Sequence, residues 1–366
     1  MPARPARRRW TRRLRLLGTV TVVWVLALAI GATPAAAHGV GGVDPTNYQT
    51  RVLAVEPAVS GLSVEVVDAG ARLRVRNTTN EEVIVLGYAG EPYLRLGPDG
   101  VFVNRRSPAT FLNRVRIAPA APPADADPTA PPAWRRIGDG DTVAWYDHRA
   151  HWMAASDPPA VKAAPDQRHV VIPRWQVPLR AGGQQLEVTG EVRWIPGPSP
   201  WPWLAVAVGC LLLVVVAARS RPPMLLAGLV GLLVLVDLIH TVGIWAGSTA
   251  SVATKAAASL PSVVGWALGG LAVRRLVGSD PARGHVFVLV AAVLLLLVGG
   301  LSDLDSLSAS QLAVALPSPL TRSVVAGTLG LAGGLMLLTL RPPSPATHQG
   351  VSDPSTERGT RGPTLP

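Results

Sequence analysis

Apolar and polar residues alternate along the first half of the chain. From Thr50 onward, apolar pairs such as Val64 and Val66 lie two residues apart, with mostly polar residues between them. Residues two apart share one face of a strand, so this pattern is typical of half-buried β-strands. Turn-forming sequences, such as Gly-Pro-Asp-Gly at 97–100, separate the short runs. The pattern predicts an all-β sandwich.

Within this region, the sequence Asn-Thr-Thr-Asn at 77–80 predicts a hairpin tip that joins strands at 72–76 and 83–86. An Ala/Pro/Asp-rich segment at 118–132 is expected to be a loop. Further strand-rich segments are expected at 134–145, 170–172 and 185–194.

Five long apolar runs occupy the second half of the chain, and each is near the length needed to cross a bilayer. They lie at 201–218, 224–245, 256–273, 286–301 and 323–340. A Pro-rich linker at 196–200 precedes them. The sequence therefore predicts an all-α, five-helix transmembrane domain over residues 201–340, with a polar and disordered tail at 341–366.

Charged residues at the ends of these runs predict their orientation. Arg274 and Arg341 are expected on one side of the membrane and Asp303 on the other. Cytoplasmic loops are enriched in arginine and lysine. We therefore expect the N-terminal domain outside the cytoplasm and the C-terminus inside it. Lys255 and Arg322 are exceptions to this assignment.

Residues 1–37 have the composition of a signal peptide. Seven arginines precede an apolar stretch at 16–30, and Ala35 and Ala37 are the small residues that a signal peptidase recognises. Cleavage after Ala37 makes His38 the first residue of an exported β-sandwich over residues 38–195. Two alternatives stay open, which are an uncleaved membrane anchor and cleavage at another position.

The formal net charge of +11 is concentrated outside the predicted exported domain. The leader has a charge of +7, whereas residues 38–200 contain 17 basic and 17 acidic side chains. Such a distribution orients a membrane protein and forms no polyanion-binding face, so nucleic-acid binding is not expected. The single cysteine, Cys210, excludes an intrachain disulfide framework and keeps thiolate chemistry out of the exported domain.

The densest group of metal-ligating residue types comprises Asp147, His148 and His151. A mature N-terminal His38 adds its α-amino group and its imidazole as one chelate. Because nitrogen donors in a tetragonal arrangement suit Cu(II), we predict a copper site of His38, His148 and His151, with Asp147 as an orienting group or oxygen ligand. Zinc is also compatible with this set. In the alternative, these residues pack a corner of the sandwich and the histidines only form hydrogen bonds.

Asp237 and His240 lie three apart within the second predicted span and so share one helix face. Ionisable residues at that depth are costly and usually face the interior of a helical bundle, where they mark function. This pair could relay protons or accept a metal ion from the exported domain. The alternative is a polar pair that only orients the helices.

Catalytic signatures are missing from the sequence. It has no Walker loop, no Gly-x-Ser-x-Gly elbow and no His-Glu-x-x-His helix. We therefore do not expect an enzyme.

Three segments carry a resemblance to known proteins: Asn-Arg-Arg-Ser-Pro-Ala-Thr at 104–110, the segment 145–153, and Pro-Gly-Pro-Ser-Pro-Trp-Pro-Trp at 196–203. With them the chain resembles an uncharacterised family of actinobacterial membrane proteins with an exported β-rich domain. Its plan is also similar to that of the copper-resistance CopC and CopD proteins, in which a periplasmic sandwich binds Cu(II) through an N-terminal histidine and an Asp/His pair. The resemblance implies an Ig-like or CopC-like sandwich in which His38, Asp147 and His148 bind copper.

The sequence thus leads to two hypotheses of function. The first is copper capture or copper homeostasis by a membrane-anchored extracytoplasmic domain, with copper-handling proteins as partners. The second is a non-catalytic interaction or structural module of the cell envelope, in which every histidine is structural and the partner is a protein or envelope component.

Overall fold

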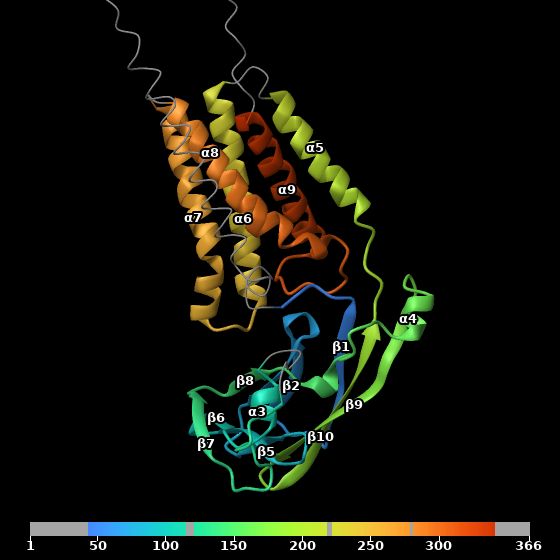
Figure 1. Ribbon diagram of the computed structural model, residues 1–366. Coiled ribbons are helices and arrows are strands. Elements are labelled where there is room, and N and C mark those ends of the chain that lie inside the picture. The colour runs from blue at the N-terminus through green and yellow to red at the C-terminus, as the bar shows by residue number, and fades with distance from the viewer. Residues whose placement is uncertain (1–42, 115–120, 218–221, 279–280, 341–366) are drawn as a thin grey trace, which may run out of the picture.

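The computed structural model describes residues 43–114, 121–217, 222–278 and 281–340. It contains a mostly antiparallel β-sheet region at residues 48–194, which is followed by a helical region (Figure 1). The predicted order of a β domain and a membrane-type helical domain is therefore confirmed. The predicted signal peptide, His38 and the C-terminal tail lie outside the described residues.

Two sheets form the β domain. The larger has seven strands in the order β1-β10-β9-β4-β5-β6-β7, and the smaller has the order β2-β3-β8. The strands are β1 (Tyr48–Glu56), β2 (Leu62–Val67), β3 (Arg72–Asn77), β4 (Val83–Leu86), β5 (Pro92–Gly97), β6 (Gly100–Asn104), β7 (Trp134–Gly138), β8 (Thr142–Trp145), β9 (His169–Ala181) and β10 (Gln184–Trp194).

The two sheets share one hydrophobic core. The smaller sheet contributes Leu73, Val75 and Trp145, and the larger sheet contributes residues such as Val177 and Val188. Along β3, buried apolar residues alternate with more exposed arginines, as the period of two predicts. The region is therefore sandwich-like, with its core between the layers.

The predicted hairpin at 77–80 is wrong. β3 pairs with β2 and β8, whereas β4 pairs with β5 and β9, so the chain crosses from one sheet to the other. Asn77 is buried at this crossing, and its Nδ2 donates to the carbonyl oxygens of Glu81 (2.9 Å) and Leu96 (3.3 Å). These bonds tie the end of β3 to the larger sheet. A turn-forming sequence gives no sign of that long-range contact.

Short helical turns connect some strands, and long helices make up the second region. The short elements are η1 (Asp68–Gly70), α3 (Ala109–Leu112), η2 (His148–Ala150) and α4 (Pro159–Ala163). The second region contains α5 (Trp201–Ala217), α6 (Pro223–Gly247), α7 (Val252–Val277), α8 (Pro281–Leu295), the π-helix η3 (Leu296–Leu301), the short η4 (Leu304–Leu307) and α9 (Ser318–Leu340).

Within the described residues, four helical segments are long and apolar enough to cross a membrane. They are α6, α7, the stretch Arg283–Leu301 that joins α8 to η3, and α9. The remaining predicted span corresponds to α5, which is apolar but has 17 residues. Length and composition thus identify four of the five predicted crossings.

The long helices run in alternating directions, so α5, α7 and α9 each begin at the end of the bundle that faces the β domain (Figure 1). Two loops at this end contact the β domain. Ser310, between η4 and α9, donates its backbone N–H to Asn47 Oδ1 at 2.8 Å. Thr249, between α6 and α7, donates its N–H to Asp68 Oδ1 at 2.8 Å and accepts from Arg72 Nη1 at 3.1 Å. These bonds fix the β domain against the bundle.

Candidate functional site

Two buried clusters contain the residues predicted from the sequence. The outer cluster, at the end of β8, comprises Trp145, Asp147, His148, Arg149 and His151. The bundle cluster, between the long helices, comprises Asp237, His240, Trp266, Asp303 and Thr328.

The outer cluster is formed where β8 ends and the chain makes the short turn η2. Asp147 caps this turn, because its Oδ1 accepts the backbone N–H of Arg149 at 3.1 Å. The turn places His148 and His151 on the same short segment. Their side chains nevertheless lie in different surroundings: His151 is buried, and His148 is partly exposed.

Both carboxylate oxygens of Asp147 are bonded within the protein. Arg149 donates from Nε to Oδ1 at 2.8 Å and from Nη2 to Oδ2 at 2.7 Å, and Trp145 Nε1 donates to Oδ2 at 3.0 Å. Burial opposes the charge of Arg149, but its hydrogen bonds and ion pair with Asp147 outweigh that effect and raise the pKa of the guanidinium above its usual value. Asp147 is therefore one half of a buried, bidentate ion pair.

Both ring nitrogens of His151 face backbone carbonyls. Nδ1 lies 2.5 Å from the carbonyl oxygen of Asp147, and Nε2 lies 2.9 Å from that of Gly70. His148 contacts Tyr88 instead. Its backbone N–H donates to Tyr88 Oη at 3.0 Å, and the centroids of the His148 and Tyr88 rings are 6.1 Å apart. Each ring nitrogen of His151 points at a carbonyl oxygen, which leaves no space for a metal ion beside either nitrogen, so His151 does not ligate a metal in this conformation.

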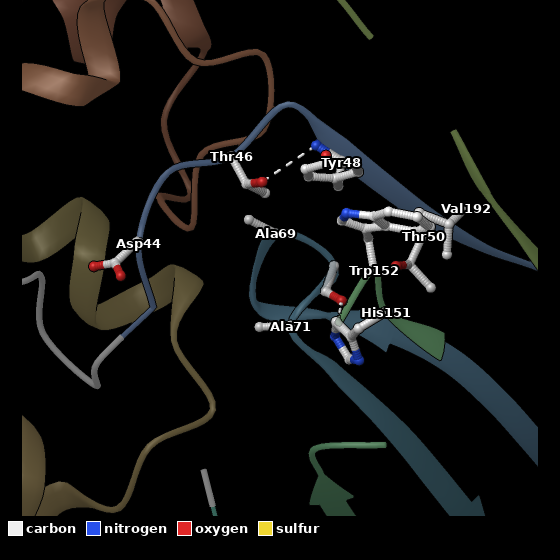
Figure 2. A pocket seen from close by; sticks show the side chains of 10 residues that line it. Asp44, Thr46, Tyr48, Thr50, Ala69, Ala71, His151, Trp152 and Val192 are labelled. Atoms are coloured by element: carbon white, nitrogen blue, oxygen red, sulfur yellow. Dashed lines mark hydrogen bonds between the residues drawn. The ribbon is translucent and has the colours of Figure 1, made fainter. Parts of the chain in front are cut away.

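A small pocket borders the outer cluster (Figure 2). Its lining includes Thr46, Tyr48 and Thr50 on one side and His151 and Trp152 on the other. The cavity volume is about 10 Å³, which is near the lower limit for one water molecule. It is too small for an organic ligand.

The predicted copper ligands do not come together as a metal site in the part of the chain that the structure describes. No group of three or more His, Cys, Asp or Glu residues there has an arrangement that could hold a metal ion. His38 lies before the first described residue. Val43, where the described chain begins, packs with Ala71 and Tyr146, so the chain enters beside the outer cluster.

The bundle cluster brings together residues from several helices. Asp237 and His240 of α6 are buried on one helix face, as their spacing predicted. Trp266 Nε1 of α7 donates to Asp237 Oδ2 at 2.7 Å. His240 Nε2 lies 3.0 Å from Oδ2 of Asp303, which lies between η3 and η4. Asp303 had been expected only as a charge at the end of a span.

Several polar atoms of the bundle cluster have no hydrogen-bond partner among the described residues. These buried atoms are Asp237 Oδ1, His240 Nδ1 and Thr328 Oγ1. The π-helix η3 passes directly beside the first of them, because a Cβ atom on Gly299 would lie 2.0 Å from Asp237 Oδ1. In a helical bundle most backbone groups bond within their own helix, so they do not satisfy such side chains.

Arg322 of α9 is a further buried charge. From the sequence, it was only an exception to the assignment of arginine-rich span ends to the cytoplasmic side. Its Nε donates to the carbonyl of Ser306 at 3.1 Å, and its Nη2 donates to that of Ala309 at 2.8 Å. The arginine thus holds the loop after η4 against the bundle. A lone arginine among apolar residues near the start of a predicted span was the available signal.

Comparison with known proteins gives no family. No family model, no curated protein and no solved structure matches this chain. The resemblance to the actinobacterial family, which rests on three short segments, therefore stays a prediction. The similarity to CopC and CopD, which rests on the plan of the chain and on His38, Asp147 and His148, stays a prediction as well.

Proposed function

We propose that this chain is a multi-pass membrane protein whose β domain lies outside the cytoplasm. Arg274 and Arg275 are in the last turn of α7, at the end of the bundle away from the β domain (Figure 1). Arginine-rich ends favour the cytoplasmic side. This arrangement supports an extracytoplasmic β domain and a cytoplasmic C-terminus.

In this proposal α5 is a fifth crossing. It packs along α9, from the end next to the β domain toward the opposite end (Figure 1). A helix of 17 residues is about 26 Å long, and the hydrocarbon core of a bilayer is about 30 Å thick. Trp201 and Trp203 at its start are residue types that favour the membrane interface.

We infer that the β domain is a non-catalytic structural or interaction module of the cell envelope. One observation carries this proposal: the internal bonding of the outer cluster. Both oxygens of Asp147 accept hydrogen bonds within the domain, and both ring nitrogens of His151 point at its backbone carbonyls. A polar network that is enclosed in this way stabilises one conformation and leaves little room for a ligand.

The contacts with the bundle support the same role. Asp68 and Arg72 form an ion pair of 3.4 Å, and both bond to Thr249 in the loop between α6 and α7. Arg72 Nη2 also donates to Tyr146 Oη at 2.9 Å, and Tyr146 lies between Trp145 and Asp147 of the outer cluster in the sequence. The outer cluster is thus connected through its neighbours to the membrane domain, which fits a module held at a fixed position above the membrane.

Metal analysis of the full-length protein in detergent tests this proposal. A structural role predicts no stoichiometric Cu(II) or Zn(II) and an unchanged metal content after His148→Ala. Stoichiometric Cu(II), with nitrogen hyperfine splitting in its electron paramagnetic resonance spectrum, would contradict it. The sample should have its N-terminus defined by mass spectrometry.

Copper capture is the second candidate function, and one observation keeps it in consideration. The described chain begins at Val43 beside Tyr146, and five residues span at most about 18 Å. If cleavage occurs after Ala37, His38 becomes the N-terminal residue five positions before Val43, which packs against Tyr146, and Tyr146 lies two residues before His148 in the sequence. Copper binding that is lost in His38→Ala, or when one residue is added before His38, would favour this candidate and its CopC-like interpretation.

A further inference from the structure

We propose that Asp237 is a proton-binding site inside the helical bundle, which exchanges protons with the β-domain side through His240 and Asp303. This proposal goes beyond the role of the β domain, because none of these residues belongs to the outer cluster. It rests on the bonding, the packing and the order of the residues in the bundle cluster.

The bonding of Asp237 is incomplete. The residue is 1% exposed, and its Oδ2 accepts from Trp266, yet its Oδ1 has no partner among the described residues. Ser262 of α7 also forms a side-chain hydrogen bond with this carboxylate, and His240 is its ionisable neighbour on α6. A buried carboxylate is costly in an apolar environment, and proton uptake removes its charge. Protonation therefore removes the charge of the Asp237 carboxylate, which the hydrogen bond from Trp266 does not neutralise.

The packing selects a proton over a metal ion. The backbone of η3 lies so close to Asp237 that even a Cβ on Gly299 would be 2.0 Å from Oδ1. A bound cation needs space and several oxygen ligands around it. Here one side of the carboxylate faces a glycine and the other accepts an indole N–H. A proton needs neither the space nor the ligands.

The polar residues of the bundle cluster lead from Asp237 toward the end of the bundle that faces the β domain. Proceeding along α6 toward the β domain, Asp237 is followed by His240, which pairs with Asp303. The side chain of Asp303 is 13% exposed, so this end of the path approaches the surface. In the opposite direction, α6 buries only apolar residues such as Val230 and Leu233. The path thus ends at Asp237 and does not cross the bundle.

The cationic side chains on the neighbouring helices α7 and α9 bond to backbone carbonyls and do not pair with Asp237. On α9, Thr328 is adjacent, whereas Arg322 donates to the carbonyls of Ser306 and Ala309. On α7, Lys255 donates to the carbonyl of Trp245 at 2.8 Å. Neither cation is paired with Asp237.

In each uptake event, the Asp303 carboxyl gives its proton to His240 Nε2, and the imidazole releases the proton on Nδ1. Because His240 Nδ1 and Asp237 share no hydrogen bond, this proton reaches the Asp237 carboxylate through a water molecule or after a side-chain rotation. Each transfer breaks one O–H or N–H bond and forms another, so the charges balance. No oxidant, reductant or metal is required. The neutral imidazole carries a proton on only one nitrogen, which allows it to pass a proton from one side to the other.

Infrared difference spectroscopy of the full-length protein in lipid tests the proposal. On lowering the pH from about 8 to about 5, across the range in which histidine titrates, a carbonyl band of a buried, protonated carboxyl group should appear and shift in deuterated water. Asp237→Asn should remove this band. Asp305→Asn, at an exposed position two residues after Asp303, is the matched control and should retain it.

Two more variants keep the test decisive if Asp237→Asn fails to fold. Trp266→Phe removes the donor to Oδ2 and keeps the carboxyl group, so the band should shift in frequency without disappearing. Asp303→Asn should slow deuteration of the Asp237 carboxyl. The same band in folded Asp237→Asn protein, or an unshifted band in Trp266→Phe, would overturn the proposal. These measurements do not depend on metal binding, so they can fail independently of the proposed function.

Discussion

Asp147 and Asp237 provide a comparison within one chain. Each is a buried aspartate, each accepts a hydrogen bond from a tryptophan indole, and each precedes a histidine by a few residues. Asp147, however, is neutralised by Arg149 and has both oxygens bonded. Asp237 has no such cation and has one unpaired oxygen. The same residue types thus stabilise structure in one region and are available for proton chemistry in the other.

The difference arises from the backbone around each aspartate. In the outer cluster the chain is irregular, so the N–H of Arg149 and the carbonyl of Gly70 are free to bond to side chains. In the bundle most backbone N–H groups are used within helices, so a buried carboxylate there needs donors from other side chains. Asp237 has such a donor on Oδ2, from Trp266, and none on Oδ1 among the described residues.

The largest expected effect is on the ion pair of the outer cluster. Asp147→Ala leaves the guanidinium of Arg149 buried without its partner and should cost about 3–5 kcal/mol of unfolding free energy. The control is Glu65→Ala, which removes an exposed ion pair with Arg74 on the same domain and should cost less than about 1 kcal/mol. Chemical denaturation followed by circular dichroism gives both values. Equal losses of unfolding free energy in the two variants would show that the ion pair of Asp147 contributes no more to stability than an exposed ion pair does.

His151 should show the next effect. His151→Ala removes the hydrogen bond that the imidazole donates to one of the carbonyls of Asp147 and Gly70 and empties a buried position, which should cost about 2–3 kcal/mol. His169→Ala is a suitable comparison, since His169 bonds to one carbonyl, that of Ala164, and is partly exposed. We expect it to cost about 1 kcal/mol. If thermal unfolding shows the two variants to be alike, the structural interpretation of His151 is wrong.

In the bundle, Gly299→Ala should perturb the site by crowding. The new methyl group would press on Asp237 Oδ1, and overpacking of this kind typically costs about 1–3 kcal/mol. Gly270→Ala on α7 meets no atom within 4 Å and should be neutral or stabilising by up to about 1 kcal/mol. Heat denaturation of the detergent-solubilised protein distinguishes them.

Combining Gly299→Ala with Asp237→Ala provides the control for that interpretation. Because the methyl group then has no carboxylate to displace, the double variant should lose less stability than the sum of the single variants. Strict additivity would mean that the cost of Gly299→Ala comes from the π-helix itself.

The sequence was informative where a pattern is local and repeated. The alternation around β3 and the apolar runs of α6 to α9 predicted the layers and four of the spans. It was less informative where a single long-range contact decides the structure. Asn77 redirects the chain between sheets through a bond to Leu96, and no turn signal encodes that contact.

The same distinction between local patterns and long-range contacts applies to the candidate site. The spacing of Asp237 and His240 predicted a shared face, because helix periodicity is local. Their partners Asp303 and Trp266 are 63 and 29 residues away in the sequence. Likewise, Asp147 and Arg149 are only two residues apart, but their bidentate pairing depends on the turn η2, which the alternation of apolar and polar residues does not predict. The side chains that complete each cluster are set by tertiary packing.

The smallest expected effect compares two buried threonines. Thr50 Oγ1, on β1, donates to the carbonyl of Ala150 at 2.9 Å, whereas Thr328 Oγ1 has no partner among the described residues. Replacing threonine with valine keeps the shape and removes the hydroxyl group. Thr50→Val should therefore cost about 1 kcal/mol.

For Thr328→Val, we expect no loss, or a gain of up to about 1 kcal/mol, because an unpaired buried hydroxyl already carries a desolvation cost. Opposite signs in parallel thermal unfolding experiments would confirm that the buried hydroxyl of Thr50 is bonded and that of Thr328 is not. A loss of stability in Thr328→Val would instead mean that its hydroxyl is bonded in the membrane, and that the environment of Asp237 is more polar than its contacts indicate.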